Sequence, residues 1–315
     1  MTDRNPDHQG VAPSVSAVIA ARNRPERLRV MLQSLHNQET RPTEVIVVDD
    51  GSDPPLPTFD GVTIQVRLDA PVGACRARNI GLARSSCKYV LFADDDAELV
   101  DPSLLRRSIQ LAERIDKLGA IAFRQVDAEG KPQWMQPLPG EQLRLAPTFY
   151  AYGALLSREA LQVAGGFFEP LEYYYEENEL CMRLMDHEFP VLYDPSLEIV
   201  HHADARGRNY RIIHRLVWRN TMFTVVARFP LWLVPGALAI ALGRWVWLAL
   251  QWRELHGSDF WWGCVELTAK LPELLRQRAP IRVATIRRVR SLRSKVVLPE
   301  LTALSESVVG TSASV

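Results

Sequence analysis

The stretch "YVLFADDDAEL", from Tyr89 to Leu99, decides the fold, because a short apolar run leads directly into three adjacent acids. Four apolar residues precede Asp94, Asp95 and Asp96. Neighbouring carboxylates repel one another unless a positive charge lies among them. Taken alone, an acidic strand end of this kind is a solvated turn more often than a cation site, so this stretch leaves both interpretations open.

A second apolar run ends in the same way. The segment "TEVIVVDDGS", residues 43–52, has the length of a strand and reaches Asp49 and Asp50. Other strand-like runs cover residues 14–21 and 62–68, and helix-like segments cover residues 24–38, 72–86 and 102–119. Strands therefore alternate with helices along the N-terminal part of the chain.

This alternation predicts an α/β fold with a mostly parallel central sheet and helices on both faces. Ligands in such sheets bind beyond the carboxyl ends of the strands. Two acidic strand ends on one edge favour a cation site over two solvated turns. Because Mg²⁺ and Mn²⁺ take carboxylates together with substrate phosphates, the pattern indicates a metal-bridged nucleotide diphosphate. No Gly-x-x-x-x-Gly-Lys-Ser/Thr loop is present, which argues against P-loop hydrolysis.

Composition limits the alternatives only broadly. The chain has 315 residues, of which 47% are hydrophobic and 23% charged, as expected of a globular protein. Its net charge of +0 predicts no partner, and its four scattered cysteines form neither a disulfide framework nor a zinc knuckle, which suits a reducing compartment. Residues 1–13 contain no apolar signal region and are expected to form a disordered leader.

Four blocks resemble, in their order and spacing, the nucleotide-binding half of family 2 glycosyltransferases. They are "VSAVIAARNRPERLRVMLQSLHNQ", "EVIVVDDGSD", "GACRARNIGLARSS" and "YVLFADDDAEL". Two later blocks, "GGFFEPLEYYYEENELCMRL" and "YDPSLEIVHH", also resemble motifs of this family. The resemblance covers about Ser14 to Asn220. It implies a GT-A nucleotide-diphospho-sugar transferase fold over residues 14–225, followed by a helical C-terminal extension.

The resemblance also implies a set of donor and metal residues. Asp50 matches the acid that accepts a hydrogen bond from the nucleotide base, and Asp94 and Asp96 match an Asp-x-Asp motif whose last acid binds the metal. His201 matches a late histidine that can complete the metal site, with His202 as the fallback. The implied donor-binding residues are Ala20, Asp50, Arg78, Asn79, Asp94 and Asp95. The implied ligands of Mg²⁺ or Mn²⁺ are Asp96, Asp94 and His201.

The acidic block of residues 176–179 is expected to supply the base. On its own, this block reads equally well as a charged first turn of a helix, which the helix dipole favours. By resemblance, Glu177 takes the place of the family's Asp and removes the proton from the acceptor hydroxyl in a single inverting displacement. Because this chain carries Glu there, the neighbouring Glu176 remains an alternative catalytic residue.

The chain changes character after Asn220. Phe229 to Trp252 is its most apolar stretch, with an uninterrupted part of 15 residues, whereas a spanning helix needs about 20. We favour a membrane-associating helix lying in the interface, within residues 226–256, over a spanning segment or a buried core helix. Residues 257–315 form a basic extension with a disordered end. Its run from Arg276 to Lys295 has eight basic residues and no acid, which suits anionic lipid better than nucleic acid.

These features predict an inverting, metal-dependent glycosyltransferase that lies in the cytoplasm, peripheral at the inner face of the cell membrane. Its partners would be a nucleotide-sugar donor and a glycan or lipid-linked acceptor, in cell-surface polysaccharide or glycolipid synthesis. The alternatives are a nucleotidyltransferase, although the first strand lacks a Gly-rich phosphate loop, and a non-catalytic homologue that only binds nucleotide sugars. The identities of the sugar, nucleotide and acceptor depend on pocket shape and are not predicted.

Overall fold

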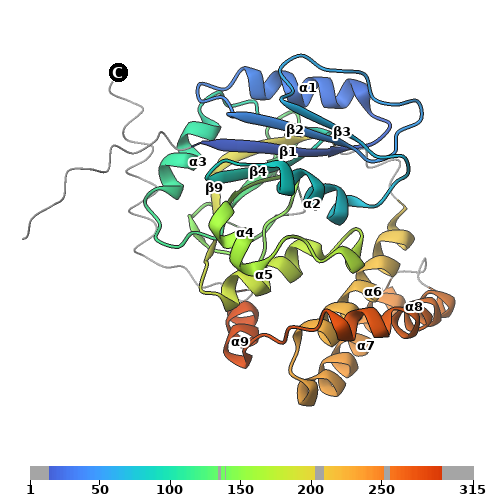
Figure 1. The fold of residues 1–315 in the computed structure, drawn as a ribbon. Helices are drawn as coiled ribbons and strands as arrows, with labels where there is room; N and C mark the ends of the chain where they lie inside the picture. The colour runs from blue at the N-terminus through green and yellow to red at the C-terminus, as the bar shows by residue number, and fades with distance from the viewer. Residues whose placement is uncertain (1–13, 134–135, 139, 203–208, 252–255, 293–315) are drawn as a thin grey trace, which may run out of the picture.

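The computed structural model describes residues 14–133, 136–138, 140–202, 209–251 and 256–292 (Figure 1). The predicted leader, residues 1–13, lies outside these ranges, as do the last residues of the basic run and the predicted disordered end.

A single mixed sheet forms the centre of the described chain. Its strands are β1 (Val15–Ala21), β2 (Glu44–Asp49), β3 (Ile64–Arg67), β4 (Tyr89–Asp94), β5 (Ala97–Glu98), β6 (Ala120–Val126), β7 (Arg144–Leu145), β8 (Gly153–Ser157) and β9 (Val191–His201). They lie in the order β3-β2-β1-β4-β8-β6-β9-β5, and β7 also pairs with β9. Strands β1, β2, β3, β4, β6 and β9 run in one direction, and β5, β7 and β8 run in the other. The predicted mostly parallel α/β sheet is confirmed.

Helices cover both faces of this sheet. One face packs against α1 (Pro25–His36) and α3 (Leu104–Ala112), and the other against α2 (Ala74–Arg84), α4 (Arg158–Ala164) and α5 (Glu176–Asp186). In α1, Pro25 occupies the first turn, where its missing N–H costs nothing, and Leu28, Met31 and Leu35 are buried at helical spacing. Helix α3 is shorter than the predicted 102–119, because the chain turns after Ala112 and adopts a positive φ at Lys117.

The parallel register brings the acidic strand ends together. Ala21 of β1 pairs with Asp49 of β2, and Ala20 of β1 pairs with Asp94 of β4. The acids that follow β2 and β4 therefore lie on either side of the same strand, at the carboxyl edge of the sheet. This is the edge at which α/β sheets bind ligands.

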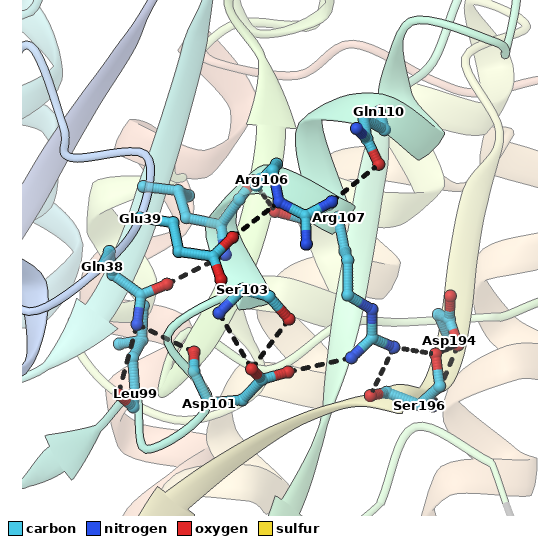
Figure 2. A network of polar contacts seen from close by, with 12 residues as sticks. Gln38, Glu39, Leu99, Asp101, Ser103, Arg106, Arg107, Gln110, Asp194 and Ser196 are labelled. Carbon is cyan, nitrogen blue, oxygen red and sulfur yellow. Dashed lines mark hydrogen bonds and ion pairs between the residues drawn. The ribbon is translucent and has the colours of Figure 1, made fainter. Parts of the chain in front are cut away.

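A polar network fixes the chain that follows the second acidic strand end (Figure 2). The buried Gln38, just after α1, donates to the carbonyl of Asp101 at 2.9 Å and accepts from the amide of Leu105 at 3.0 Å. The carboxylate of Asp101 holds Arg107 at 2.9 Å, and Arg107 in turn donates to the carbonyl of Ser196 in β9. The network ties α1, α3 and β9 together, and so restrains the strand that carries His201.

After β9, the described residues form four α-helices: α6 (Tyr210–Arg228), α7 (Val234–Gln251), α8 (Gly257–Arg276) and α9 (Val283–Leu292). They lie beyond α5, on the side of the molecule opposite α1 (Figure 1). Helix α6 runs through the predicted domain boundary at residue 225. All of α7 is described and none of its 18 residues is buried, so the core-helix alternative for this stretch is wrong.

Candidate active site

An arginine offsets part of the negative charge of the three acids at the end of β4. Arg24, which precedes α1, places its Nη1 atom 3.1 Å from Oδ1 of Asp95 and 3.0 Å from Oδ2 of Asp96. Burial raises the pKa of Asp95 to about 7, although Arg24 opposes the rise. This guanidinium and that of Arg78, which pairs with Asp94, supply the positive charge that the acidic stretch demands.

His201, at the end of β9, lies against the last of these acids. Its Nε2 atom is 3.0 Å from Oδ1 of Asp96, and its ring stacks on Tyr152 with centroids 5.3 Å apart. Burial opposes ionisation of Asp96, but the hydrogen bond from His201 and the charge of Arg24 hold its pKa below the usual range. The backbone amide of His202 donates to the carbonyl of Asp96, while its ring turns away to Glu98. The structure therefore brings His201, and not His202, to the acids.

Asp94, Asp96 and His201 fit a divalent cation. Each offers one ligand atom, and the three atoms lie within 4.8 Å of one another. Two carboxylates and one imidazole form a mixed oxygen and nitrogen set, which suits Mn²⁺ better than the oxygen-preferring Mg²⁺.

The surroundings of His201 support this fit. Its Nδ1 atom lies 2.8 Å from Nε2 of Gln125 in β6. The other amide atom of Gln125, the buried Oε1, has no hydrogen-bond partner among the described residues. The same nitrogen of Gln125 also donates to Oε1 of Gln133 at 2.5 Å. If both amides were turned over, Gln125 would offer its oxygen to a protonated Nδ1, which would leave Nε2 of His201 free to bind a metal.

A buried guanidinium joins the acidic strand end to α5. Arg78, in α2, donates to Oδ1 of Asp94 at 2.9 Å and to Oε1 of Glu176 at 2.8 Å. It also lies over the ring of Phe167, 5.5 Å from its centroid. Burial raises the pKa of Glu176 despite this pairing. One arginine thus connects a donor-side acid with one of the two candidate bases.

Glu177, the other candidate base, has no cation against it among the described residues. Its side chain accepts one hydrogen bond, from the backbone amide of Ala151 at 3.2 Å. Burial, and next the charge of Glu176, raise the pKa of Glu177 to about 8, while Arg78 opposes the rise. A carboxyl with a pKa near the working pH is suited to take up a proton. Geometry and charge therefore favour Glu177 over Glu176 as a base.

The two acids after β2 have different partners. Asp49 orients the turn, because its carboxylate accepts from the amides of Ser52 and Leu56 and pairs with Arg67 at 2.7 Å. Asp50 accepts from the backbone amides of Val72 at 2.6 Å and Gly73 at 3.2 Å. Asp50 therefore fixes the loop that opens α2, and its role toward a nucleotide base stays a prediction.

Asn79 does not reach the acidic cluster in this structure. Its amide nitrogen donates to the carbonyl of Phe167 at 2.8 Å, and its oxygen accepts from the Phe167 amide at the same distance. Residue 166 must be a glycine for this contact to form, since a Cβ added at Gly166 would lie 2.4 Å from the Asn79 oxygen. Asn79 thus docks α2 on the Gly165–Gly166 turn, and its predicted contact with the donor stays untested.

No sequence motif indicates that Arg24, Gln125 and Tyr152 lie at this edge of the sheet. Arg24 lies 71 residues from Asp95, and Gln125 lies 76 residues from His201. Neither pair has a local spacing that could reveal it. The available signal was chemical: three adjacent acids demand a cation, and "RNRPER" is a basic segment directly after β1 on the same sheet edge. Taken together, the site residues form an edge of the sheet at which Asp94, Asp96 and His201 can hold a metal-bound diphosphate. The carboxyl of Glu177, on the neighbouring helix α5, can accept a proton.

The sequence model described as Glycosyl transferase family 2 matches residues 16–168 of the chain. This range contains the acids after β2 and β4 and the whole of α2, but it ends before α5. The match is independent of the geometry above and points to the same edge of the sheet.

Individual relatives share about a quarter of their aligned residues with this chain. The O-antigen biosynthesis protein RfbC of Myxococcus xanthus is 26% identical over 255 residues, which cover 71% of this chain and 20% of that protein. The pre-mycofactocin glycosyltransferase of Mycobacterium tuberculosis is 24% identical over 258 residues, covering 75% of this chain and 53% of that protein. The chain thus spans between about a fifth and about half of the length of these relatives.

Solved structures share the fold. The mannosyltransferase PcManGT from Pyrobaculum calidifontis, solved in complex with GDP-Man and Mn²⁺, has a TM-score of 0.51 and 18% sequence identity. The alignment covers 84% of this chain and 89% of that one. At this identity the likeness supports the GT-A architecture alone.

Proposed function

Because residues 16–168 make this chain a member of glycosyl transferase family 2, we propose that it moves a sugar from a nucleotide-diphosphate donor to an acceptor hydroxyl, with inversion. One observation carries the proposal. The ligand atoms of Asp94, Asp96 and His201 lie within 4.8 Å of one another at the carboxyl edge of the sheet. Arg78 connects this cluster directly to the helix that bears Glu177.

Asp94, Asp96 and His201 would hold the divalent cation, Mn²⁺ in preference to Mg²⁺. When bound, the metal neutralises charge that develops on the departing nucleotide diphosphate. PcManGT, a protein of this fold, was solved with a donor and a metal of these kinds, GDP-Man and Mn²⁺. Arg24 holds Asp95 and Asp96 in place from the other side.

Glu177 would act as general base. It takes the proton of the acceptor hydroxyl while that oxygen bonds to the anomeric carbon, and the bond from this carbon to the diphosphate oxygen breaks. The electron pair of the broken bond leaves with the nucleotide. Arg78 pairs with Glu176, so of the two candidate bases Glu177 is the one that has no cationic partner among the described residues.

The acceptor side would face a membrane, in cell-surface polysaccharide or glycolipid synthesis, as the O-antigen relative suggests. Within the described residues, the helical segment Leu231–Gln251 is long and apolar enough to span a bilayer, and none of its residues is buried. Trp232, Trp247 and Leu250 are more than half exposed, and α9 carries the exposed Arg287, Arg288 and Arg290. These features suit a peripheral contact with anionic lipid at the cytoplasmic face.

Liposome flotation tests the membrane contact. We expect the full-length protein to float with anionic vesicles and to be released only partly by high salt, because apolar burial is not screened. Absence of flotation with any lipid composition would contradict the contact and leave the transferase proposal intact. Resistance to both salt and alkaline carbonate would instead indicate a spanning helix.

The transferase proposal is tested by a thermal-shift screen of UDP-, GDP- and dTDP-sugars with and without Mn²⁺. A bound donor stabilises the folded state by mass action, by about 2.7 kcal/mol at 100 times its Kd. We expect one nucleotide class to raise the melting temperature in the presence of Mn²⁺, followed by release of the nucleoside diphosphate on incubation. Binding without turnover toward water or any glycan would favour the non-catalytic alternative.

A further inference from the structure

The loop that leads into α5 has an unusual backbone. After a short 3-10 turn (Glu169–Leu171), the residues Glu172, Tyr174 and Tyr175 adopt φ angles of 60°, 66° and 74°. Residues with a Cβ rarely adopt positive φ, and such conformations persist only where the surroundings impose them. The next residue after this loop is Glu176, and the proposed base Glu177 follows. The conformation of the loop therefore sets the position of both carboxylates.

Asn220, in α6, holds this loop from the C-terminal side. Its side chain is fully buried, and its amide nitrogen lies 2.8 Å, 2.9 Å and 2.6 Å from the carbonyl oxygens of Leu171, Tyr173 and Tyr174. These carbonyls surround the positive-φ segment. Its amide oxygen accepts from Nε of Arg219 at 2.9 Å, which fixes which way the amide faces. Both polar atoms of the Asn220 side chain are therefore engaged, the nitrogen with the loop and the oxygen with Arg219.

Arg219, the neighbour of Asn220 in α6, also holds the loop. It donates to the carbonyl of Leu171 at 2.9 Å and pairs with the carboxylate of Glu172 at 3.0 Å. Helix α8 supports it, since the ring of Trp262 lies 5.7 Å from its guanidinium carbon and Glu266 lies 3.9 Å away. The holding residues thus come from the C-terminal helices, outside the part of the chain that matches the family model.

The loop also contacts the donor side of the site. The carbonyl of Glu172 accepts from the backbone amide of Cys75 in the first turn of α2 at 3.1 Å. A Cβ added at Gly73 would lie 3.3 Å from the same carbonyl oxygen, so the two segments are in close contact. Gly73 is one of the two residues whose amides bind Asp50. The loop therefore lies between the base helix and the segment that holds Asp50.

We propose that Asn220 and Arg219 are positioning residues that hold residues 171–175 in the strained conformation that places Glu177 for proton removal. The proposal rests on the function proposed above. It assigns the C-terminal helices a part in the reaction itself, separate from any contact with lipid. Neither residue touches the acidic cluster in the structure, so their effect is exerted through the loop.

The test compares Asn220→Leu with Thr224→Val in the full-length protein. Leu has nearly the shape of Asn but donates no hydrogen bond. Thr224 lies one turn further along α6, is buried, and has an Oγ1 atom without a partner among the described residues, so its replacement is the matched control. Hydrogen–deuterium exchange is followed in peptides covering residues 169–180 and in the strands β1 and β4. Hydrolysis of the donor found in the thermal-shift screen is measured per nucleotide-binding site, and the Kd of the matching nucleoside diphosphate with Mn²⁺ is measured separately.

We expect Asn220→Leu to exchange faster in residues 169–180 with unchanged protection of β1 and β4. Its kcat should fall about 100-fold, the cost of a misplacement of about 1 Å at a reacting group. The nucleoside diphosphate Kd should stay within about threefold, because no contact with the nucleotide is removed. Thr224→Val should match the wild type. Unchanged exchange and kcat in Asn220→Leu would overturn the proposal, as would a loss of nucleotide affinity as large as the loss of kcat.

If Asn220→Leu does not fold, Arg219→Lys tests whether α6 positions residues 171–175. Lysine keeps the charge beside Glu172 but lacks the planar fork that reaches Leu171 as well. We expect faster exchange of the loop and a kcat about tenfold lower, a milder form of the same misplacement. Wild-type exchange and turnover in Arg219→Lys would mean that α6 only supports the fold. If the wild type turns over no donor with water or with any glycan, the proposed function fails, while the exchange comparison still decides whether α6 holds the loop.

Discussion

Two glutamates in the first turn of α5, Glu177 and Glu179, lie two residues apart. Their surroundings differ in whether guanidinium groups lie beside the carboxylate, and this difference separates a structural role from a catalytic one. Glu179 is fully buried and pairs with Arg183 at 2.6 Å and with Arg228 of α6. Burial opposes its ionisation, but the two guanidinium groups hold its pKa below the usual range. Glu177 is buried as well, but among the described residues its carboxyl accepts a hydrogen bond only from a backbone amide, and its pKa is raised to about 8. A buried carboxylate that is paired with cations stays charged and anchors the helix. A buried carboxyl without a cation has a raised pKa and is suited to accept a proton.

Removing the anchor should have the largest effect. Glu179→Gln leaves the guanidinium groups of Arg183 and Arg228 buried without their counter-charge. Breaking a buried ion pair by removing one partner costs about 3–5 kcal/mol. We expect urea unfolding to show a loss of that size in the free energy of unfolding. A loss below about 1 kcal/mol, the value of an exposed pair, would contradict the assignment of Glu179 as an anchor.

Removing the proton acceptor should leave stability almost unchanged and suppress the reaction. Glu177→Gln keeps the shape of the side chain and the hydrogen bond from Ala151. We expect the transfer rate to fall at least about 100-fold, the lower end of general-base contributions, while donor affinity stays the same. Glu176→Gln is the matched neighbour, and it should weaken the contact with Arg78 without abolishing turnover. If Glu176→Gln proves to be the inactive variant, the base has been assigned one position too late.

The pH dependence sharpens the same comparison. A base is active only when deprotonated, so a pKa raised to about 8 places the active form of Glu177 on the alkaline side. We expect kcat/KM to rise with pH by up to about tenfold per unit below pH 8 and to level off above it. Glu177→Gln should remove this limb. A kcat/KM profile that is already flat at pH 6 would mean that another group is the base.

The sequence predicted what depends on local pattern. Apolar runs of strand length and helical spacing were sufficient to place β1, β2, β4, α1 and α2, and parallel register then brought Asp49 and Asp94 to one edge. The acidic first turn of α5 was also visible. What the pattern could not show was which charges are paired, because Arg78 and Glu176 are 98 residues apart in the chain.

The apolar stretch around α7 illustrates the same limit. Composition left three interpretations open, and only tertiary structure shows that this helix stays outside the core. The reverse holds for Asn220, which ended the recognisable part of the sequence and gave no sign of its role. Its three carbonyl partners are backbone atoms, and no side-chain pattern records them.

The central claim is that Asp94, Asp96 and His201 bind the metal that holds the donor diphosphate. Isothermal titration of the donor identified by thermal shift, in Mn²⁺ and in EDTA, tests it with the wild type, Asp96→Ala and, as a control outside the site, Thr224→Val. We predict that the wild type and Thr224→Val bind donor in Mn²⁺ and lose this binding in EDTA, and that Asp96→Ala binds in neither. Equal affinity of the wild type for the donor in Mn²⁺ and in EDTA would contradict the claim.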